Sequence, residues 1–513
     1  MSDKLVMGID SGTSSIKVAL FDIHGNKVCS CAKKNIIKNK DNNYEQDMEL
    51  LWTEVCDVIK ELIHKNSIDA SNILSIGIAG QGEGCWLIDK YGKPVRNAIL
   101  WSDGRANDIV AETNGNKDIK DEIRRITGSV LFAGASTAIM MWLKKYEPES
   151  LKKAEHFMFC KDWLRFKLTG LVGMEVTDAS TSLLNLKDKT LSKDLFEILN
   201  IKECMDLIPQ ISNSCDLSGT VNKEVEELTG LKEGTPVVYG MMDISAAAIG
   251  MGAVNAGDCC TLIGTTICNE VIRKDYKFSD ESTSGYEIYP VKDLCLNVIA
   301  PMAGTRNLDW VINNLFKMEK EEALRNNVSI YKLLEEKIKD IPSGARGVIY
   351  LPYISSSGER APFYDCNARA EFFGLSENTD KYCMLKAVYE GIAFAIKDCI
   401  KDIEGLNKIY LGGGGSESMY LAKLLADCTG KEIIIPYGNK FTAKGAAIAA
   451  GVYSGLYKDM KEAVKSTSKV KKSIKPDIKN TKKYEELYNL YKLLREMNKE
   501  PWKIRRNILK KYN

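Results

Sequence analysis

Short apolar segments and one long amphipathic segment alternate over the first eighty residues. Residues 4–10, 15–23 and 27–35 are apolar or alternating and are separated by turn residues, so the pattern predicts three strands. Residues 48–65 carry apolar side chains at helical spacing, and residues 73–80 are a continuous apolar run. The order strand, strand, strand, helix, strand is typical of an α/β fold.

A similar order returns in the second half of the chain. A hairpin at 257–272, a strand at 295–302 and a long helix at 382–400 precede a strand that enters a glycine turn at 408–415. A helix at 418–430, a strand at 431–436 and a small-residue helix at 442–455 follow. We interpret the two halves as a duplication with a cleft between them. The predicted domains are 1–250, 251–455 and a Lys-rich helical tail, 456–513.

Composition narrows the partners rather than the activity. The chain has 513 residues and a formal net charge of +2, so its overall charge does not favour nucleic acid or a membrane surface. No apolar run approaches the roughly 20 residues that span a bilayer, and the first residues lack the apolar core of a signal peptide. We therefore expect a cytoplasmic protein with no nucleic acid or membrane partner. The basic end of the tail is interpreted as a solvated face rather than an RNA or lipid patch.

A run of small, mostly hydroxylic residues interrupts the first two strands directly after Asp10. Small residues let the backbone approach a phosphate closely, and clustered N–H groups bind anions. Asp10 is expected to hold Mg²⁺ through water, since Mg²⁺ keeps most of its hydration shell. A plain hairpin turn is the alternative for this stretch alone. The residues expected to bind a phosphate here are Gly12, Thr13, Ser14, Ser15 and Lys17.

The second half offers a matching turn at Gly264, Thr265 and Thr266, again between two predicted strands. One phosphate-binding turn in each half would hold one triphosphate between the halves. With this pair, the chain resembles the FGGY family of carbohydrate kinases, within the actin-like ATPase superfamily. The resemblance covers nearly the whole chain and rests on co-linear segments at 8–22, 98–106, 161–170, 177–185, 239–254, 263–266, 303–310, 351–376 and 411–427. Ile139 and Cys383 depart from the family's two signature patterns.

The resemblance implies two actin-like, ribonuclease H-like domains with an ATP site in the cleft between them, and ATP and Mg²⁺ as cofactors. It also implies that Asp243 is the catalytic base. Asp243 follows an apolar strand, where a carboxylate faces the substrate; the alternative is that it only caps a helix beginning at Ile244. Further residues implied at the nucleotide are Gly304, Asn307, Gly414, Gly415 and Ser418.

The segment 81–84 is expected to contact the substrate. Gln81, Gly82 and Glu83 follow a buried strand, and their pattern is closest to that of erythritol-type polyol kinases. We expect the glycines to leave room for the ligand and Glu83 to accept hydrogen bonds from neighbouring hydroxyls. The alternative is that Glu83 pairs with Arg105 or another cation. Asp103 and Arg105 either shape the same wall or form a structural ion pair.

Together these features predict ATP-dependent phosphorylation of a hydroxyl of a small sugar or polyol. The expected substrates are a pentulose such as xylulose or an erythritol-like polyol. The sequence leaves open whether the protein forms a homodimer. The alternatives are a non-enzymatic actin-like ATPase and a sugar-sensing regulator of the same superfamily.

Overall fold

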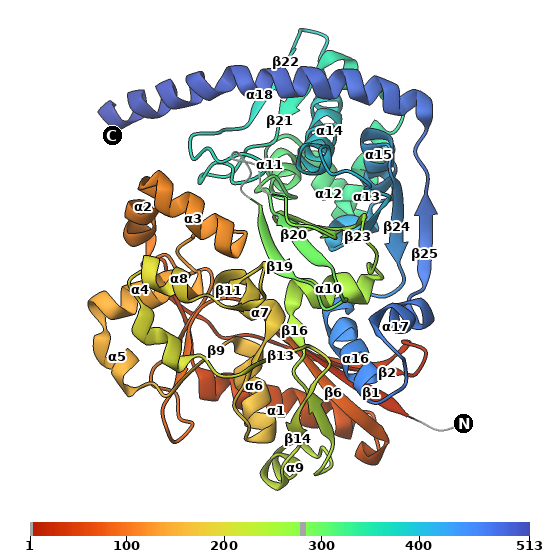
Figure 1. Ribbon diagram of the computed structural model, residues 1–513. Coiled ribbons are helices and arrows are strands. Elements are labelled where there is room, and N and C mark those ends of the chain that lie inside the picture. The colour runs from red at the N-terminus through yellow and green to blue at the C-terminus, as the bar shows by residue number, and fades with distance from the viewer. Residues whose placement is uncertain (1–3, 278–283, 513) are drawn as a thin grey trace.

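Two sheets of closely related topology organise the protein, whose computed structural model describes residues 4–277 and 284–512 (Figure 1). In the first sheet, three strands are antiparallel neighbours, two more continue the sheet in parallel and an antiparallel strand closes it. In that order the strands are β3 (Lys27–Lys34), β2 (Ser15–Asp22), β1 (Leu5–Ser11), β6 (Ile73–Gly80), β15 (Pro236–Val238) and β14 (Leu217–Thr220).

The second sheet repeats this pattern and adds one edge strand, β19 (Gly285–Ile288). Three antiparallel neighbours are again followed by two parallel strands and a closing antiparallel strand. The strands are β20 (Cys295–Ile299), β18 (Ile267–Arg273), β17 (Asp258–Ile263), β23 (Lys408–Gly412), β24 (Glu432–Pro436) and β25 (Val470–Ile474). The related order of the two halves, expected from the sequence, is confirmed at the level of topology.

Two helices of small residues lie between the sheets. Helix α10 (Asp243–Met251) packs on the second sheet, where the Cys260 thiol contacts the carbonyl of Ala248, while α16 (Phe441–Tyr453) packs on β1 and β6 of the first. A Cβ on Gly8 or Gly77 would lie 1.8 or 1.9 Å from a carbonyl oxygen of α16. These contacts bury backbone against backbone, which only residues without a Cβ permit.

Helices cover the outer faces of both sheets. In the first half, α1 (Met48–Lys65) begins at the N-cap Asp47, and its apolar stripe packs on β2 and β3. Between β6 and β14 the chain adds mostly short helices, α2 (Asn107–Gly115), α3 (Lys117–Thr127), α4 (Ser136–Tyr146), α5 (Pro148–Lys153), α6 (Cys160–Thr169), α7 (Val176–Ser182) and α8 (Lys193–Ile198). In the second half, α14 (Lys381–Ile400) is almost wholly buried, and α15 (Met419–Thr429) follows β23.

The prediction that the tail, residues 456–513, is helical is wrong in one respect. After α17 (Met460–Thr467) the chain forms β25, which completes the second sheet by pairing with β24. Only then does α18 (Ile478–Tyr512) cross the top of the molecule in Figure 1, burying Tyr484, Tyr488 and Tyr491. The sequence gives little sign of this strand, because residues 470–474 read VKKSI without alternation and four of the five positions are exposed.

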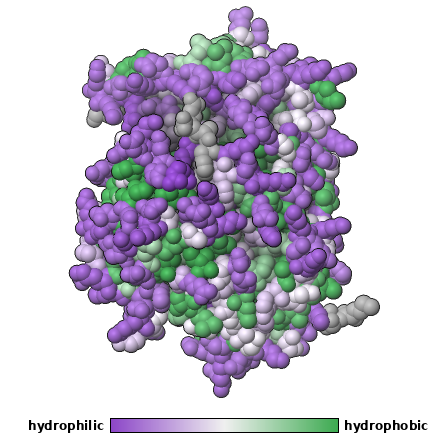
Figure 2. Space-filling view, in the orientation of Figure 1, coloured by the Kyte–Doolittle hydropathy of each residue, from purple (hydrophilic) through white to green (hydrophobic). Residues whose placement is uncertain are grey.

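Figure 2 shows a mainly hydrophilic surface on this side, with apolar side chains in separate groups. Within 4–277 and 284–512, no helix is both long enough and apolar enough to cross a membrane.

Candidate active site

Three parallel strands of the first sheet end side by side and place the polar residues that follow them together. Strand β16 (Met241–Met242) pairs with the end of β6, where Met242 is the neighbour of Gly80. On the other side of β6, Ser11 of β1 is the neighbour of the same Gly80. Because the strands are parallel, Asp10, Gln81 and Asp243 emerge at one edge of the sheet.

Asp10 is buried and is bonded to the lysine expected to bind phosphate. The two residues are cross-strand neighbours, and Lys17 Nζ lies 2.9 Å from Asp10 Oδ2. Burial raises the pKa of Asp10, and Lys17 offsets part of that rise. Among the described residues, no group of three acidic, Cys or His side chains is arranged to hold a metal. A magnesium ion here would therefore need water and phosphate oxygens for most of its ligands, as Mg²⁺ usually does.

Asp243 is the first residue of α10, not the residue before it. Its side chain is only partly exposed, and the protein around it removes most of the water that would stabilise its charge. Burial, and then the nearby charge of Asp10, raise the pKa of Asp243 to about 7. A carboxylate with such a pKa can accept a proton near neutral pH.

The turn from Gly12 to Ser14 is held from behind by Asn35. Its backbone N–H donates to Ser14 O at 3.1 Å and its Nδ2 donates to Gly12 O at 2.5 Å. Thr13 Oγ1 accepts from Trp101 Nε1 and donates to Gln81 Oε1. Ser14 is exposed and Ser15 is partly exposed, so hydroxyls of this turn remain open to a ligand.

The matching turn of the second half joins β17 to β18, with Gly264 and Thr265 exposed. The N–H of Thr305 donates to Gly264 O, and a Cβ on Gly304 would lie 2.3 Å from Thr265 O. The structure therefore brings Gly264, Thr265, Thr266 and Gly304 together. Asn307 lies behind them, fully buried, and its amide bonds to Gly304 O and the Tyr350 hydroxyl.

The glycine loop after β23 packs on the end of β17, just before that turn. Gly413 has a φ of +74°, and a Cβ on it would lie 2.6 Å from Ile263 O. A Cβ on Gly415 would lie 2.6 Å from the Ile263 side chain, whereas one on Gly414 would meet nothing within 4 Å. Ser418 caps α15 and donates to Glu335 at 2.6 Å. The exposed backbone at Gly414 is therefore next to the phosphate turn.

The residues after β6 are more firmly held than the sequence suggested. Gln81 uses both ends of its amide, accepting from Thr13 and donating to Gln46 Oε1 at 3.0 Å. Glu83 is buried, and its Oε2 accepts from the backbone N–H and the hydroxyl of Ser136 and from the hydroxyl of Ser182. Burial raises the pKa of Glu83, and these donors offset part of that rise.

Two interpretations of this segment are wrong. The glycines do not leave open room: a Cβ on Gly82 would lie 2.3 Å from Met242 Cε, and one on Gly84 would lie 2.5 Å from Ile99 O. The alternative that Glu83 pairs with Arg105 is not found either. Arg105 instead forms ion pairs with Asp103 and Glu45.

Asp103 belongs to a structural ion pair. Its Oδ1 accepts from Arg105 N and Nε, each at 2.8 Å, and its Oδ2 accepts from Tyr44 N at 2.7 Å. Of the two roles left open by the sequence, the structure shows the ion pair directly. Trp101, two residues earlier, is exposed and reaches the first turn by donating to Thr13.

The sequence analysis missed a second buried carboxylate near Asp243. Glu270 on β18 is fully buried, and neither of its oxygens has a hydrogen-bond partner among the described residues. Burial, and then the charge of Asp243, raise the pKa of Glu270 well above its usual range. The available signal was an acid within the apolar strand ICNEVI.

A buried ionic cluster behind Gln81 was also missed. Lys161 Nζ lies 2.5 Å from Asp178 Oδ2, and Glu175 and Asp162 are within 3.5 Å of the same nitrogen. Burial alone would lower the pKa of Lys161, but the three acids raise it. Only the fold brings α6 and α7 together here.

Comparison with known proteins gives the same assignment over both halves. Models of the N-terminal and C-terminal domains of the FGGY family of carbohydrate kinases match residues 5–250 and 259–454. The chain is 29% identical to an erythritol kinase of Brucella abortus over 87% of this chain and 86% of that protein. It is also 29% identical to a xylulose kinase of Bacillus subtilis, over 95% of this chain and 96% of that protein.

Solved structures agree on the fold without selecting a sugar. A ligand-bound xylulose kinase from Lactobacillus acidophilus matches with a TM-score of 0.87 and 26% identity, covering 96% of this chain and 98% of that chain. A gluconate kinase from the same organism matches with the same TM-score, identity and coverage. Relatives named for different substrates are thus equally similar in fold.

Proposed function

The chain belongs to the FGGY family of carbohydrate kinases, and from this premise we propose that it phosphorylates a hydroxyl of an acyclic four- or five-carbon sugar or polyol. Kinases of this family use ATP. The expected acceptors are a pentulose such as xylulose or an erythritol-like polyol. The observation that carries the proposal is the position of Asp243, at the meeting point of three strand ends, with a pKa raised to about 7.

Asp243 acts as the general base in this proposal. It accepts the proton of the substrate hydroxyl as that oxygen attacks, and a base with a pKa near the working pH is best suited to do so. Base catalysis of this kind contributes on the order of 100- to 10,000-fold in rate. Helix α10 supports the role because its small residues fix the backbone between the two sheets.

ATP with Mg²⁺ would supply the transferable phosphoryl group. In the proposal, Gly12 to Ser15 and Gly264 to Thr266 would donate hydrogen bonds to its phosphates, and Gly304 would keep the second turn close. Gly414 and Gly415 would bind the adenosine, while Asn307 and Ser418 position these loops through Tyr350 and Glu335. Asp10 would hold the ion through water. Lys17 would remain beside Asp10, part-exposed and able to meet a phosphate oxygen.

The substrate hydroxyls would meet the residues after β6. The segment from Gln81 to Glu83 lies close to Asp243, because Gly82 packs against Met242, the residue before Asp243. Asp103 supports the segment around Trp101 by pairing with Arg105. Carboxylate and amide acceptors suit a ligand rich in hydroxyls, because these oxygens have several lone pairs and can accept further hydrogen bonds beside those from Thr13, Ser136 and Ser182. The alternatives of a non-enzymatic ATPase or a sugar-sensing regulator are not favoured, since the relatives named above are kinases.

A panel of acceptors with Asp243→Asn as the test variant checks the proposal. We expect ATP consumption with pentuloses, pentitols or tetritols that exceeds that with glycerol or furanone-type acceptors. Asp243→Asn should bind ATP and keep its fold but lose at least about 100-fold in kcat, because an amide nitrogen accepts no proton.

Asp57→Asn is the matched control, since Asp57 is an exposed acid on the outer side of α1. It should keep the kcat of the unaltered protein. Turnover of Asp243→Asn near that of the unaltered protein would remove Asp243 from the mechanism. Turnover restricted to glycerol or furanones would overturn the substrate class while leaving kinase chemistry in place.

A further inference from the structure

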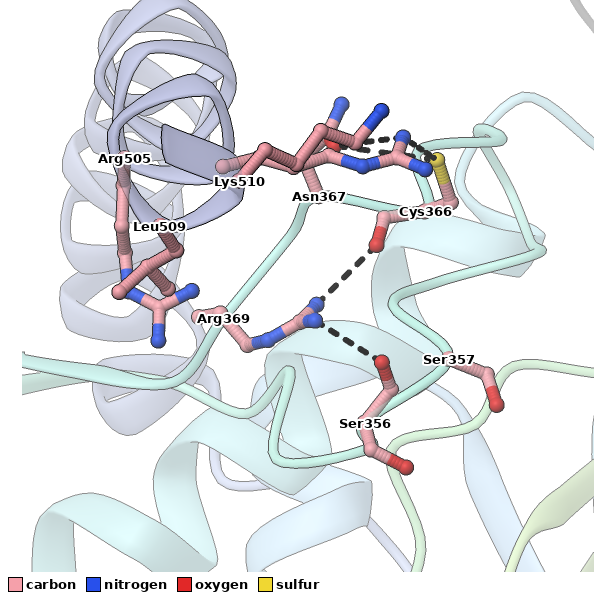
Figure 3. A pocket seen from close by; sticks show the side chains of 9 residues that line it. Ser356, Ser357, Cys366, Asn367, Arg369, Arg505, Leu509 and Lys510 are labelled. Carbon is pink, nitrogen blue, oxygen red and sulfur yellow. Dashed lines mark hydrogen bonds between the residues drawn. The ribbon is translucent and has the colours of Figure 1, made fainter. Parts of the chain in front are cut away.

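A pocket that shares no residue with the proposed site lies between the end of α18 and the loop 355–369. Its volume is about 370 Å³, within the range typical of small-ligand sites. Figure 3 shows Arg505 and Leu509 of α18 on one side and Arg369 of the loop on the other. Its lining residues are Ser356, Ser357, Cys366, Asn367, Arg369, Arg505, Arg506, Leu509 and Lys510.

The charge of this pocket, called here the α18 pocket, is one-sided. Four of its lining residues are cations and none is an acid. Among the described residues, none of these four cations has an acidic side chain within ion-pair distance, although ion pairs are common elsewhere on α18. Like charges held together without a counter-charge destabilise a site, and an anion bound between them relieves the repulsion.

The sequence of α18 concentrates this charge at its end. Up to Glu500 the helix mixes acids and bases, whereas 501–513 carries Lys503, Arg505, Arg506, Lys510 and Lys511 and no acid. The change in composition coincides with the stretch that lines the α18 pocket. A general solubility role would not require the acids to stop at that point.

The pocket is also built rather than merely charged. Arg369 donates to the carbonyl oxygens of Ser356, Cys366 and Ala368, which fixes the plane of its guanidinium. Arg506 donates to Cys366 Sγ and Asn367 Oδ1, each at 3.0 Å, and so joins α18 to the loop. A fixed guanidinium presents paired donors that match phosphate oxygens, and Ser356 and Ser357 add hydroxyl donors.

The loop has a second face on the nucleotide side. Glu359 pairs with Asp365 through two backbone hydrogen bonds, which closes the loop on itself. The Glu359 carboxylate accepts from Met302 N at 2.7 Å, and Gly304, two residues on, packs on the turn at Thr265. One loop therefore touches both the α18 pocket and the support of the proposed phosphate turn.

We propose that the α18 pocket is a second anion site, separate from the nucleotide turns, that binds a small phosphorylated metabolite with at least two negative charges. The pocket is large enough for one such molecule and little more. Its concave shape favours a free metabolite over a phosphate on a lipid surface. None of the residues that line the α18 pocket was assigned to phosphoryl transfer above.

Inorganic pyrophosphate is the probe that tests this site, with calorimetric titration of the full chain as the measurement. We expect pyrophosphate to bind the unaltered protein, and Arg505→Glu to weaken that binding at least tenfold while the KM for ATP stays within twofold. Lys503→Glu is the matched control, because Lys503 is exposed on the same helix but does not line the pocket. This substitution changes the net charge by the same amount as Arg505→Glu. It should bind pyrophosphate like the unaltered protein.

A milder pair, Lys510→Ala against Lys511→Ala, repeats the comparison if Arg505→Glu disturbs the end of α18. If Lys503→Glu or Lys511→Ala weakened pyrophosphate binding as much as its partner variant in the pocket, the site would be overturned. Binding would then depend only on the overall charge of the helix end. Binding that ATP fully displaces, or citrate binding more tightly than pyrophosphate, would also overturn it. Sedimentation with vesicles containing phosphatidic acid should show no binding that depends on Arg505; such binding would overturn the choice of a free metabolite.

Discussion

At the scale of single residues, the protein changes the chemistry of its acids by burying them together. Asp10, Asp243 and Glu270 come from three strands or strand ends, and burial is the main cause of the raised pKa of each. Of these three acids, only Asp10 has a cation bonded to it among the described residues. This arrangement leaves Asp243 with an affinity for protons that matches neutral pH.

The pH dependence of kcat/KM tests that arrangement. Asp243 works as a base only when deprotonated, so we expect kcat/KM to rise with pH through a midpoint of about 7. Asp10→Asn removes the neighbouring negative charge, which should move the midpoint to lower pH whatever it does to the maximal rate. A midpoint unmoved by Asp10→Asn would show that the two carboxylates are not coupled.

Substitution of Glu83 distinguishes a role in supporting the fold from a role in binding the substrate. Glu83→Gln keeps an acceptor oxygen for Ser136 and Ser182, so we expect the free energy of unfolding to change by less than about 1 kcal/mol. Loss of the charge should lower kcat/KM about tenfold, or about 1.4 kcal/mol, if the carboxylate meets substrate hydroxyls. Urea unfolding and steady-state kinetics measure the two quantities.

Glu83→Ala provides the contrast, because it leaves buried donors without an acceptor and should lower the free energy of unfolding by about 1–3 kcal/mol. Kinetic constants of Glu83→Gln equal to those of the unaltered protein would assign Glu83 to the scaffold alone.

At the scale of elements, the contact between α10 and α16 fixes the position of Asp243. A Cβ on Gly445 would lie 1.9 Å from Ala246 O, and one on Gly250 would lie 1.9 Å from Phe441 O. Both closest atoms are backbone, which cannot rotate away. The two helices are therefore held at a separation that only glycine allows.

Gly445→Ala tests the importance of this contact. We expect a loss of about 1–3 kcal/mol in the free energy of unfolding, because an extra methyl group in a packed interior forces the helices apart. The kcat should fall as well, since α10 carries Asp243 at its first position. Gly115→Ala is the control: it also adds a methyl group to a helix, but that Cβ would meet nothing within 4 Å. Equal stability of the two variants would contradict the tight packing.

At the scale of the whole molecule, the proposed site draws on both sheets. Asp10 lies at the end of β1, and Gln81 and Asp243 follow strands of the first sheet, whereas Gly264 and Gly414 follow strands of the second. Phosphoryl transfer requires these groups around one substrate and one nucleotide, with water excluded from the phosphate.

Small-angle scattering tests whether the halves move. We expect the radius of gyration to fall when both an acceptor sugar and a non-hydrolysable ATP analogue are present, and to fall less with either alone. Identical profiles in all four states would argue against a closing motion around a shared nucleotide.

The sequence alone determined the local elements and their order. Residues 48–65 were predicted as a helix and form α1 with those bounds, because its apolar spacing and the Asp47 cap are local signals. Both glycine and hydroxyl turns, the duplicated strand order and a helix at 418–430 were likewise predicted, although α15 begins at Met419 and Ser418 is its N-cap. Such features depend on neighbours within a few positions along the chain.

The tertiary structure decided what depends on distant residues. The apolar strand expected directly before Asp243, residues 235–242, divides into β15 and β16, since Gly240 adopts a φ of +76° against the carbonyl of Ile78. The space beside Gly82 is filled by Met242, Glu83 is bonded to Ser136 and Ser182, and Lys17 is bonded to Asp10. Except for the cross-strand pair, these partners are separated by more than fifty residues. Hydrophobic periodicity determines which face of an element is buried, but only packing of the complete chain determines which polar groups meet there.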